Sequence, residues 1–304
     1  MVDSGKMFSR KTIIELKIKS VLMKLLRFMY DNDIRLGRLE GDSVVDLSQS
    51  HLPRDMISLL APNKNTMDLA RQAEGAVYPL ERVQILQPIE RPPKILAIGL
   101  NYKDHIEETG LGTPEFPMFF NKQSTAANGP YDPIHLPIVS DKLDYEGEMG
   151  FIIGRSCRHV SRAQAKEVIA GYVVCNDVSV RDWQMRAQTF TLGKSFDTHC
   201  PFGPWVTTVD EISDPHNLGL KTWVDGEIRQ DSNTRHLVFD CYSQIETLTA
   251  AFTLEPGDLI LTGTPSGVGI GFSPKKYLTI GQKVRVEIEK LGYIENEVIA
   301  EPAK

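Results

Sequence analysis

Short runs in which apolar and polar residues alternate predict a protein rich in β-strands. Between residues 24 and 47 such runs are interrupted by Asp-Asn-Asp and Glu-Gly-Asp, which are typical of tight turns. This part of the sequence predicts a small β-meander, and a helical stretch follows around residues 67–74. The proline-rich segment LQPIERPPK marks the main domain boundary. We therefore expect a small N-terminal β domain over 24–88 and a larger domain over 89–304.

The larger domain alternates strands with turns and has few helices. Asn101 is expected to cap a short helix that Gly110 ends, and Ser161 to cap a helix that runs through Ala170 to Gly171. Strands are expected at 94–100, 117–122, 142–154 and 171–180 and in several hairpins after residue 204, a loop at 124–137 and a last helix around 241–252. Because strands outnumber helices and no βαβ repeat is visible, the predicted fold class is α+β, mostly β, with mixed, mainly antiparallel sheets.

Composition narrows the classes of partner. The 304 residues include 34 Lys and Arg against 40 Asp and Glu, which gives a formal charge of -6. No global positive field favours nucleic acid or a membrane surface, so we expect neither partner. Four scattered cysteines without a CxxC pair fit a reducing compartment rather than a disulfide framework or a zinc site.

The segment before the meander is basic and amphipathic. Residues 7–29 resemble a mitochondrial presequence, although Glu15 is unusual in one. The alternative is a soluble leader or helix ahead of the fold. We therefore expect residues 1–23 to form a leader or targeting segment of a mitochondrial or cytoplasmic protein. The segment has too many charges to span a membrane.

Acidic residues crowd the entrance of one strongly apolar strand. In KLDYEGEMGFIIG, side chains two positions apart point to the same face, so Asp144, Glu146 and Glu148 would line up on one side. Burying such carboxylates without partners is costly, so either this end of the strand lies in water or a cation lies between them.

A further carboxylate, Asp177, follows the apolar run YVVCN, where a functional acid is common at the end of a buried strand. Oxygen ligands without Cys or His suit Mg²⁺ or Mn²⁺, with Ca²⁺ as a further option. The sequence therefore predicts a divalent-metal site at Glu146, Glu148 and Asp177, against the alternative of a solvated strand end.

Other charged residues lie near the ends of predicted strands. His105 and Glu108 are three apart on one helix face, where the carboxylate can orient the imidazole, although an exposed ion pair would have the same spacing. Lys194 lies between apolar and glycine residues and could either point to solvent or face a substrate oxygen. Arg181 and Gln184 would share a pocket with the metal site if their segment is helical, and a solvated helix face is the alternative.

The segment GDLILTGTPSGVG predicts a strand that leads into a loop rich in glycine and threonine. Its glycines would let backbone N–H groups approach an anion, although an ordinary tight turn also uses glycine. The loop lacks the Gly-Lys-Ser/Thr ending of a phosphate-binding P-loop.

Together, these motifs resemble those of the fumarylacetoacetate hydrolase family. They are DYEGEMGFIIG, CNDVSVRDWQ, LGKSFDTHCPFGP, SNT and GDLILTGTPSGVG, in that order, and the resemblance covers about residues 90–300. It implies a mixed β-sandwich roll, a homodimer, and Mg²⁺ or Mn²⁺ bound by the three carboxylates. It also implies His105 and Glu108 as the pair that activates water and Lys194 as a catalytic cation. The substrate contacts that it implies are Arg181, Gln184 and Thr264.

Such a site acts on small anionic 2-oxo acids. The metal would stabilise an enolate while a C–C bond of an acylpyruvate or β-diketo acid is hydrolysed, which is the main hypothesis. The alternative is tautomerisation or decarboxylation of oxaloacetate, which needs the same enolate but no attacking water. A catalytically silent metabolite-binding protein is a third hypothesis, although no residue of the expected site is missing.

Overall fold

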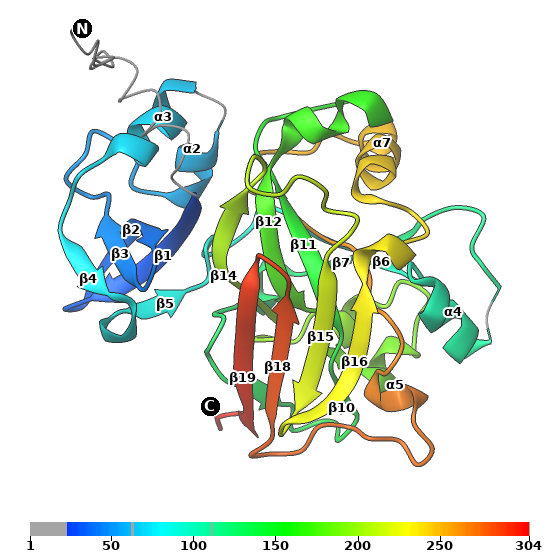
Figure 1. Cartoon of the computed structure of the whole chain (residues 1–304). Helices are drawn as coiled ribbons and strands as arrows, with labels where there is room; N and C mark the ends of the chain where they lie inside the picture. The colour runs from blue at the N-terminus through cyan, green and yellow to red at the C-terminus, as the bar shows by residue number, and fades with distance from the viewer. Residues whose placement is uncertain (1–22, 62–63, 111, 304) are drawn as a thin grey trace, which may run out of the picture.

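The computed structural model describes residues 23–61, 64–110 and 112–303. The expected leader over 1–23 therefore lies, except for its last residue, outside the described residues. Within them, strands form one large sheet, a five-stranded sheet and a two-stranded ribbon, with short helices at the periphery (Figure 1). The predicted α+β, mostly β fold class is confirmed.

The N-terminal part is the predicted meander. Its first turn uses Asp31 and Asn32, both with positive φ, as a tight two-residue hairpin turn requires. Its elements are β1 (Lys24–Tyr30), β2 (Asp33–Glu40), β3 (Ser43–Asp46), α2 (Met56–Leu60), α3 (Lys64–Gln72), β4 (Val77–Pro79), η1 (Leu80–Arg82) and β5 (Gln84–Leu86).

The meander continues the large sheet of the second part, because β1 pairs antiparallel with β14. The order of the strands is β4-β3-β2-β1-β14-β12-β11-β17-β6-β7. The strands of the second part are β6 (Ile95–Gly99), β7 (Met118–Lys122), β8 (Ala127–Asn128), β11 (Gly147–Ile153), β12 (Ile169–Asn176), β14 (Cys200–Thr208) and β17 (Leu259–Leu261).

The five-stranded sheet packs on one face of this sheet and lies in front of it in Figure 1. Buried Met149, Phe151 and Val174 of the large sheet share one apolar core with Val224 and Val286 of the smaller one. The smaller sheet contains β9 (Ile134–Leu136), β15 (Gly219–Val224), β16 (Glu227–Asn233), β18 (Lys283–Ile288) and β19 (Gly292–Ala300), and the ribbon contains β10 (Leu143–Asp144) and β13 (Ser179–Val180).

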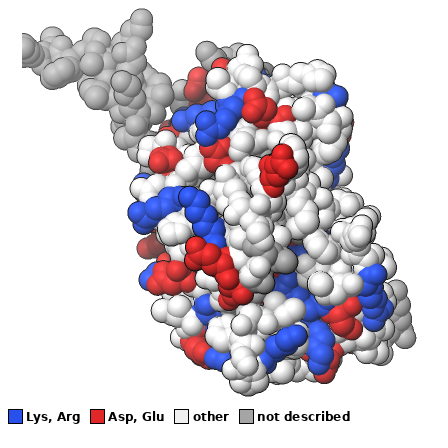
Figure 2. Space-filling view, turned by 90° about the vertical axis from the view of Figure 1, so that its right-hand side faces the viewer, with Lys and Arg blue, Asp and Glu red and all other residues white. Residues whose placement is uncertain are grey.

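The helices of the second part are short and lie around the sheets. They are α4 (Lys103–Thr109), α5 (Arg181–Gln184), α6 (Thr191–Lys194) and α7 (Cys241–Ala251), with the 3₁₀ turns η2 (Ser124–Ala126), η3 (Arg162–Val168), η4 (Thr234–His236) and η5 (Gly269–Gly271). No helix in the described part of the chain is both long and apolar enough to cross a membrane. On the face shown in Figure 2, acidic and basic side chains are interspersed between uncharged areas.

Two predictions about helix ends are wrong. Tyr102, and not Asn101, is the N-cap of α4, because the Asn101 amide instead donates to the backbone oxygens of Thr262 and Phe239. The helix expected from Ser161 to Gly171 is only η3, which ends at Val168 before β12 begins. Gly171 lies in β12, where a Cβ would be 2.5 Å from the Thr207 carbonyl oxygen, so it permits close strand pairing rather than ending a helix.

The loop expected over 124–137 is also more ordered than predicted, since it contains η2, β8 and β9. Both strands are very short, and each pairs in parallel with a strand distant in sequence. Periodicity over two or three residues is too brief to reveal such pairing.

Candidate active site

Three carboxylates meet where β11 begins and β12 ends. The antiparallel pairing of Gly147 with Asn176 places Glu146 and Glu148 beside Asp177. One carboxylate oxygen from each of the three lies within 4.8 Å of the others, and all three residues are buried. The three carboxylates are therefore grouped as predicted, and this end of the strand is buried rather than exposed to solvent.

Asp144 does not join this group. The ribbon strand β10 ends at Asp144, and the chain turns before β11 starts at Gly147, so the expected alternation along one strand is broken. The Asp144 carboxylate instead accepts hydrogen bonds from Arg181 Nε at 2.7 Å and from the backbone N–H groups of Gly269 and Ile270 at 2.7 and 2.9 Å.

Buried cations surround the three carboxylates. Lys194 Nζ lies 2.6 Å from Glu146 Oε2 and 2.8 Å from Asp177 Oδ2. Lys122 Nζ, from the end of β7, donates to Asp177 Oδ1 at 2.6 Å and to the Val178 carbonyl oxygen at 3.1 Å. Lys122 is not among the residues predicted for the site, although its position just after the apolar run MFF parallels that of Asp177.

The charges are unevenly compensated. Burial opposes ionisation of Glu146, but Lys194 and Arg181 outweigh it and hold the pKa of Glu146 well below its ordinary value. Glu148 has the opposite balance: burial, and then the nearby Asp177 and Glu146 carboxylates, raise its pKa well above the ordinary value. A divalent cation would relieve this repulsion, and an all-oxygen donor set suits a hard ion. The residues therefore fit such an ion.

Arg181 is held rigidly at the edge of the acidic group. Its Nη1 atom pairs with Glu146 Oε1 at 2.6 Å and donates to Gln184 Oε1 at 2.9 Å, while Nε donates to Asp144. Nη2 is buried and has no hydrogen-bond partner among the described residues. A fixed guanidinium with one unused donor is suited to binding a carboxylate.

The glycine-rich loop contacts both halves of the site. The backbone N–H of Gly263 donates to Glu148 Oε2 at 2.6 Å, and that of Gly267 donates to Glu108 Oε1 at 3.0 Å. Both glycines have positive φ, near +94° and +97°, which other residues rarely adopt. Buried Thr264 donates to the Gly147 carbonyl oxygen at 3.0 Å. Backbone N–H groups of the loop thus donate to carboxylates, and these carboxylates are the Glu148 and Glu108 side chains of the protein itself.

His105 and Glu108 form the predicted pair on α4. Glu108 Oε2 lies 2.9 Å from His105 Nδ1, which leaves Nε2 as the outward nitrogen of the imidazole. Burial opposes ionisation of Glu108, but the hydrogen bonds from His105 and Gly267 outweigh it and lower the pKa of Glu108. A carboxylate that stays ionised and fixed can orient the imidazole and stabilise its protonated form.

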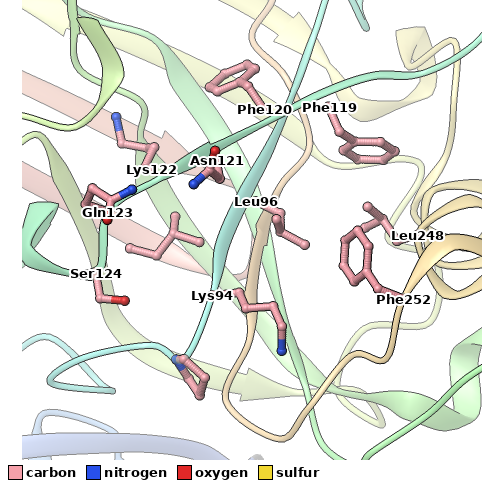
Figure 3. Close-up of a pocket in the computed structure, with 12 residues that line it drawn as sticks. Lys94, Leu96, Phe119, Phe120, Asn121, Lys122, Gln123, Ser124, Leu248 and Phe252 are labelled. Carbon is pink, nitrogen blue, oxygen red and sulfur yellow. The ribbon is translucent and has the colours of Figure 1, made fainter. Parts of the chain in front are cut away.

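A separate hollow of about 540 Å³ lies between β6, β7 and α7. Figure 3 shows Phe119, Leu248 and Phe252 around Leu96 in this hollow, while the amine of Lys122 points away from them. Its lining is mainly apolar and brings together no group of reactive side chains. The acidic group, and not this hollow, is therefore the candidate active site.

Comparison with known proteins identifies the family. The family model described as fumarylacetoacetate (FAA) hydrolase C-terminal matches residues 94–299. The chain belongs to the fumarylacetoacetate hydrolase family. A second model, described as Rv2993c-like, N-terminal, matches residues 23–88 of this family member.

Relatives of this fumarylacetoacetate hydrolase family member cover most of its length. It is 43% identical to "Oxaloacetate tautomerase Fahd2a, mitochondrial" of Rattus norvegicus over 98% of this chain and 100% of that protein. It is 40% identical to "Oxaloacetate tautomerase FAHD2A, mitochondrial" of Homo sapiens over 85% of each chain. These are enzymes, and so is this family member.

Solved structures support the same assignment. Maleylpyruvate hydrolase from Sphingobium sp. SYK-6, in complex with manganese (II) ion and pyruvate, is 34% identical to this family member, with a TM-score of 0.76. The similarity covers 92% of this chain and 100% of that one. The β-sandwich roll implied by the family motifs is thereby confirmed.

Proposed function

We propose that this enzyme is a divalent-metal-dependent oxaloacetate tautomerase, which moves a proton between the enol and keto forms of its substrate. The observation that carries the proposal is the buried group of Glu146, Glu148 and Asp177, with oxygens within 4.8 Å of one another. The names of the rat and human relatives favour tautomerisation over hydrolysis of a C–C bond, which was the main hypothesis from the sequence.

Glu146, Glu148 and Asp177 would hold Mg²⁺ or Mn²⁺. When bound, such an ion acts as a Lewis acid that polarises a 2-oxo acid and eases loss of a proton from the adjacent carbon. Lys194 now lies between Glu146 and Asp177, so we propose that its ammonium turns toward a substrate oxygen when the site is loaded. A fixed cation there stabilises negative charge that develops on that oxygen.

Arg181 and Gln184 would orient the substrate, whereas the hydroxyl of the expected third contact, Thr264, is already bonded to Gly147 and Gln230. The unused Nη2 donor of Arg181 would bind a carboxylate of oxaloacetate, because Asp144 and Glu146 already fix the rest of the guanidinium. Gln184 is held in the same cluster through its bond to Arg181. A bound divalent ion, together with Arg181 and Lys194, would offset the charge of a dianionic substrate at this position.

His105 would carry the proton. Its Nδ1 atom is bonded to Glu108, so Nε2 can take a proton from one substrate atom and return it to the other. Glu108 would keep the tautomer and orientation of the ring fixed. No water is consumed in this reaction, which needs only one group that both accepts and donates a proton.

Hydrolysis of a C–C bond is the second candidate function. The same His105–Glu108 pair could activate a water molecule, and the maleylpyruvate hydrolase of known structure has the same fold. Purified wild type should be assayed with Mg²⁺ against oxaloacetate enol, acetylpyruvate and fumarylpyruvate, in parallel with His105→Ala.

Our proposal requires wild type to convert the oxaloacetate enol much faster than it cleaves either acylpyruvate. His105→Ala should lose about 10²-fold in that conversion if the imidazole carries the proton. Fast cleavage of an acylpyruvate with no effect on oxaloacetate would instead establish the hydrolase, and loss of CO₂ from oxaloacetate would establish a decarboxylase.

We also propose that the protein is a mitochondrial homodimer. The rat and human relatives are both named as mitochondrial, and residues 7–29 have the composition of a presequence. Fractionation of cells expressing the full chain tests the location, and light scattering of the purified protein tests the dimer. A cytosolic monomer would contradict both parts.

A further inference from the structure

Gln230 connects the five-stranded sheet to the acidic group through the core. It lies on β16, opposite the beginning of β11, and its side chain is only 1% exposed. Its Oε1 atom accepts a hydrogen bond from the Gly147 backbone N–H at 3.0 Å. Its Nε2 atom donates to Thr264 Oγ1 at 2.8 Å and to the Pro265 carbonyl oxygen at 2.9 Å. One amide therefore bridges two segments of the site.

Both segments that Gln230 holds carry residues of the acidic group or contact it. Gly147 lies between Glu146 and Glu148 in the sequence. The position of its backbone therefore determines the positions from which both glutamate side chains extend. The loop residue Gly263, next to Thr264, donates its N–H to Glu148 Oε2 at 2.6 Å. Thr264 Oγ1 also donates to the Gly147 carbonyl oxygen, which closes a ring of hydrogen bonds through Gln230, Thr264 and Gly147.

The chain packs closely against the smaller sheet at Gly147. A Cβ at Gly147 would lie 2.2 Å from Thr222 Oγ1 and 3.1 Å from Gln230 Oε1. The first contact is shorter than real Cβ atoms show, so β11 approaches the smaller sheet more closely here than a residue with a Cβ would permit. The Gly147 peptide therefore lies close against the smaller sheet, and its hydrogen bond to Gln230 holds it in that position.

We infer that Gln230 is a positioning residue, which sets the separation of the Glu146 and Glu148 carboxylates for a divalent ion without touching that ion. The inference rests on the proposed metal site. Groups that orient metal ligands typically change metal affinity by about 10- to 100-fold when they are removed. A glutamine that only filled the core would affect stability and leave ion affinity unchanged.

Gln244 provides a matched control. It is a glutamine buried to 0% exposure on α7, and its Nε2 donates to the Phe239 carbonyl oxygen at 2.8 Å. None of its hydrogen bonds joins the acidic group or the Gly147 peptide. Gln230→Met and Gln244→Met thus remove the same amide from two buried positions, and only the first change breaks the bridge.

The test is calorimetric titration of Mg²⁺ into wild type, Gln230→Met and Gln244→Met, with thermal unfolding measured on each. We expect both variants to unfold at lower temperature, Gln230→Met to bind Mg²⁺ at least about 10-fold more weakly, and Gln244→Met to bind within about twofold of wild type. Equal affinities in the two variants would overturn the inference.

Two further outcomes keep the proposals separate. Wild type that binds no divalent ion would overturn the proposed metal site itself, whatever Gln230 does. If Gln230→Met fails to fold, Gln230→Asn is measured instead, because it keeps the amide but is one methylene too short to span Gly147 and Thr264. Unchanged Mg²⁺ affinity in folded Gln230→Asn would then contradict the positioning role.

Discussion

At the scale of single residues, Glu148 differs most from the other two carboxylates. Lys194 bonds to both Glu146 and Asp177, whereas Glu148 accepts a hydrogen bond from the backbone N–H of Gly263. Its raised pKa reports that the carboxylate is poorly compensated. Such a group lowers the stability of the metal-free protein and, in the proposed metal site, would contribute to ion binding, so removing its charge should have opposite effects on the two properties.

We therefore predict that Glu148→Gln abolishes Mg²⁺ binding and turnover but raises the stability of the metal-free protein by about 1 kcal/mol, because like charges no longer repel. Calorimetry with Mg²⁺ and urea unfolding in a chelator measure the two effects. A destabilised metal-free variant would mean that Glu148 is well compensated, and retained ion binding would remove it from the proposed ligand set.

Sequence reasoning worked for residues whose chemistry is visible in their type and spacing. Residue type and spacing predicted that Glu146, Glu148 and Asp177 meet, the family resemblance added Lys194 and Arg181, and all five lie together. Gln230 could not be predicted, because its contact with Gly147 depends on how two distant sheets pack. The position of Lys122 at the end of an apolar run could have marked it as a candidate site residue. Only the fold, however, shows that β7 ends beside Asp177.

At the scale of elements, α4 is held against the glycine-rich loop and β16. Its Asp104 carboxylate accepts from Ser232 Oγ at 3.0 Å and from Ser266 Oγ at 3.4 Å, while Glu108 accepts from the Gly267 N–H. These bonds fix where His105 lies relative to the carboxylates. The helix itself was predicted from sequence, but its N-cap was not, because the tertiary bonds of Asn101 outweigh its capping preference.

We predict that Glu108→Gln lowers the turnover number for oxaloacetate enol by about 10²-fold, because the imidazole loses the charge that orients and stabilises it. The amide oxygen can still accept from Gly267, so stability and Mg²⁺ affinity should change little. Glu107→Gln, on the exposed side of the same helix, is the matched control. Equal turnover of the two variants would show that Glu108 has no role in proton transfer.

At the scale of the whole molecule, one continuous sheet joins the N-terminal meander to the second part through β1 and β14. Hydrophobic patterning predicted most strands, whereas the partners and order of those strands depend on contacts between residues far apart in sequence. The buried His199, just before β14 and at the opposite end of that strand from the residues that pair with β1, bonds through Nε2 to the His135 carbonyl oxygen at 2.8 Å. Its protonation couples the stability of the fold to pH.

Burial lowers the pKa of His199 to about 3, against 6.5 for an unperturbed imidazole. The unfolded chain therefore takes up a proton at a higher pH than the folded one, and stability falls as the pH drops below 6.5 toward 3. At pH 5 this loss amounts to about 2 kcal/mol. We predict that His199→Gln, which cannot titrate, removes this loss in urea unfolding at pH 5 and 7.5.

The exposed His51→Gln is the control for this prediction and should leave the pH dependence of unfolding unchanged. A wild-type protein that is equally stable at pH 5 and 7.5 would contradict a neutral, buried His199. So would a His199→Gln variant that loses as much stability on acidification as wild type does.

Lys194 lies between Glu146 and Asp177 as an internal counter-ion, and it partly neutralises the carboxylates that we propose as metal ligands. In the proposed metal site, folding would then not require magnesium, and binding of the ion would displace the Lys194 ammonium. We predict that excess EDTA stops turnover but lowers the melting temperature by no more than about 5 °C. Differential scanning calorimetry with and without chelator would reveal a larger drop, and activity should return when Mg²⁺ is restored. The activity of such an enzyme would depend on the free Mg²⁺ concentration in its compartment, because the ion would not be permanently bound.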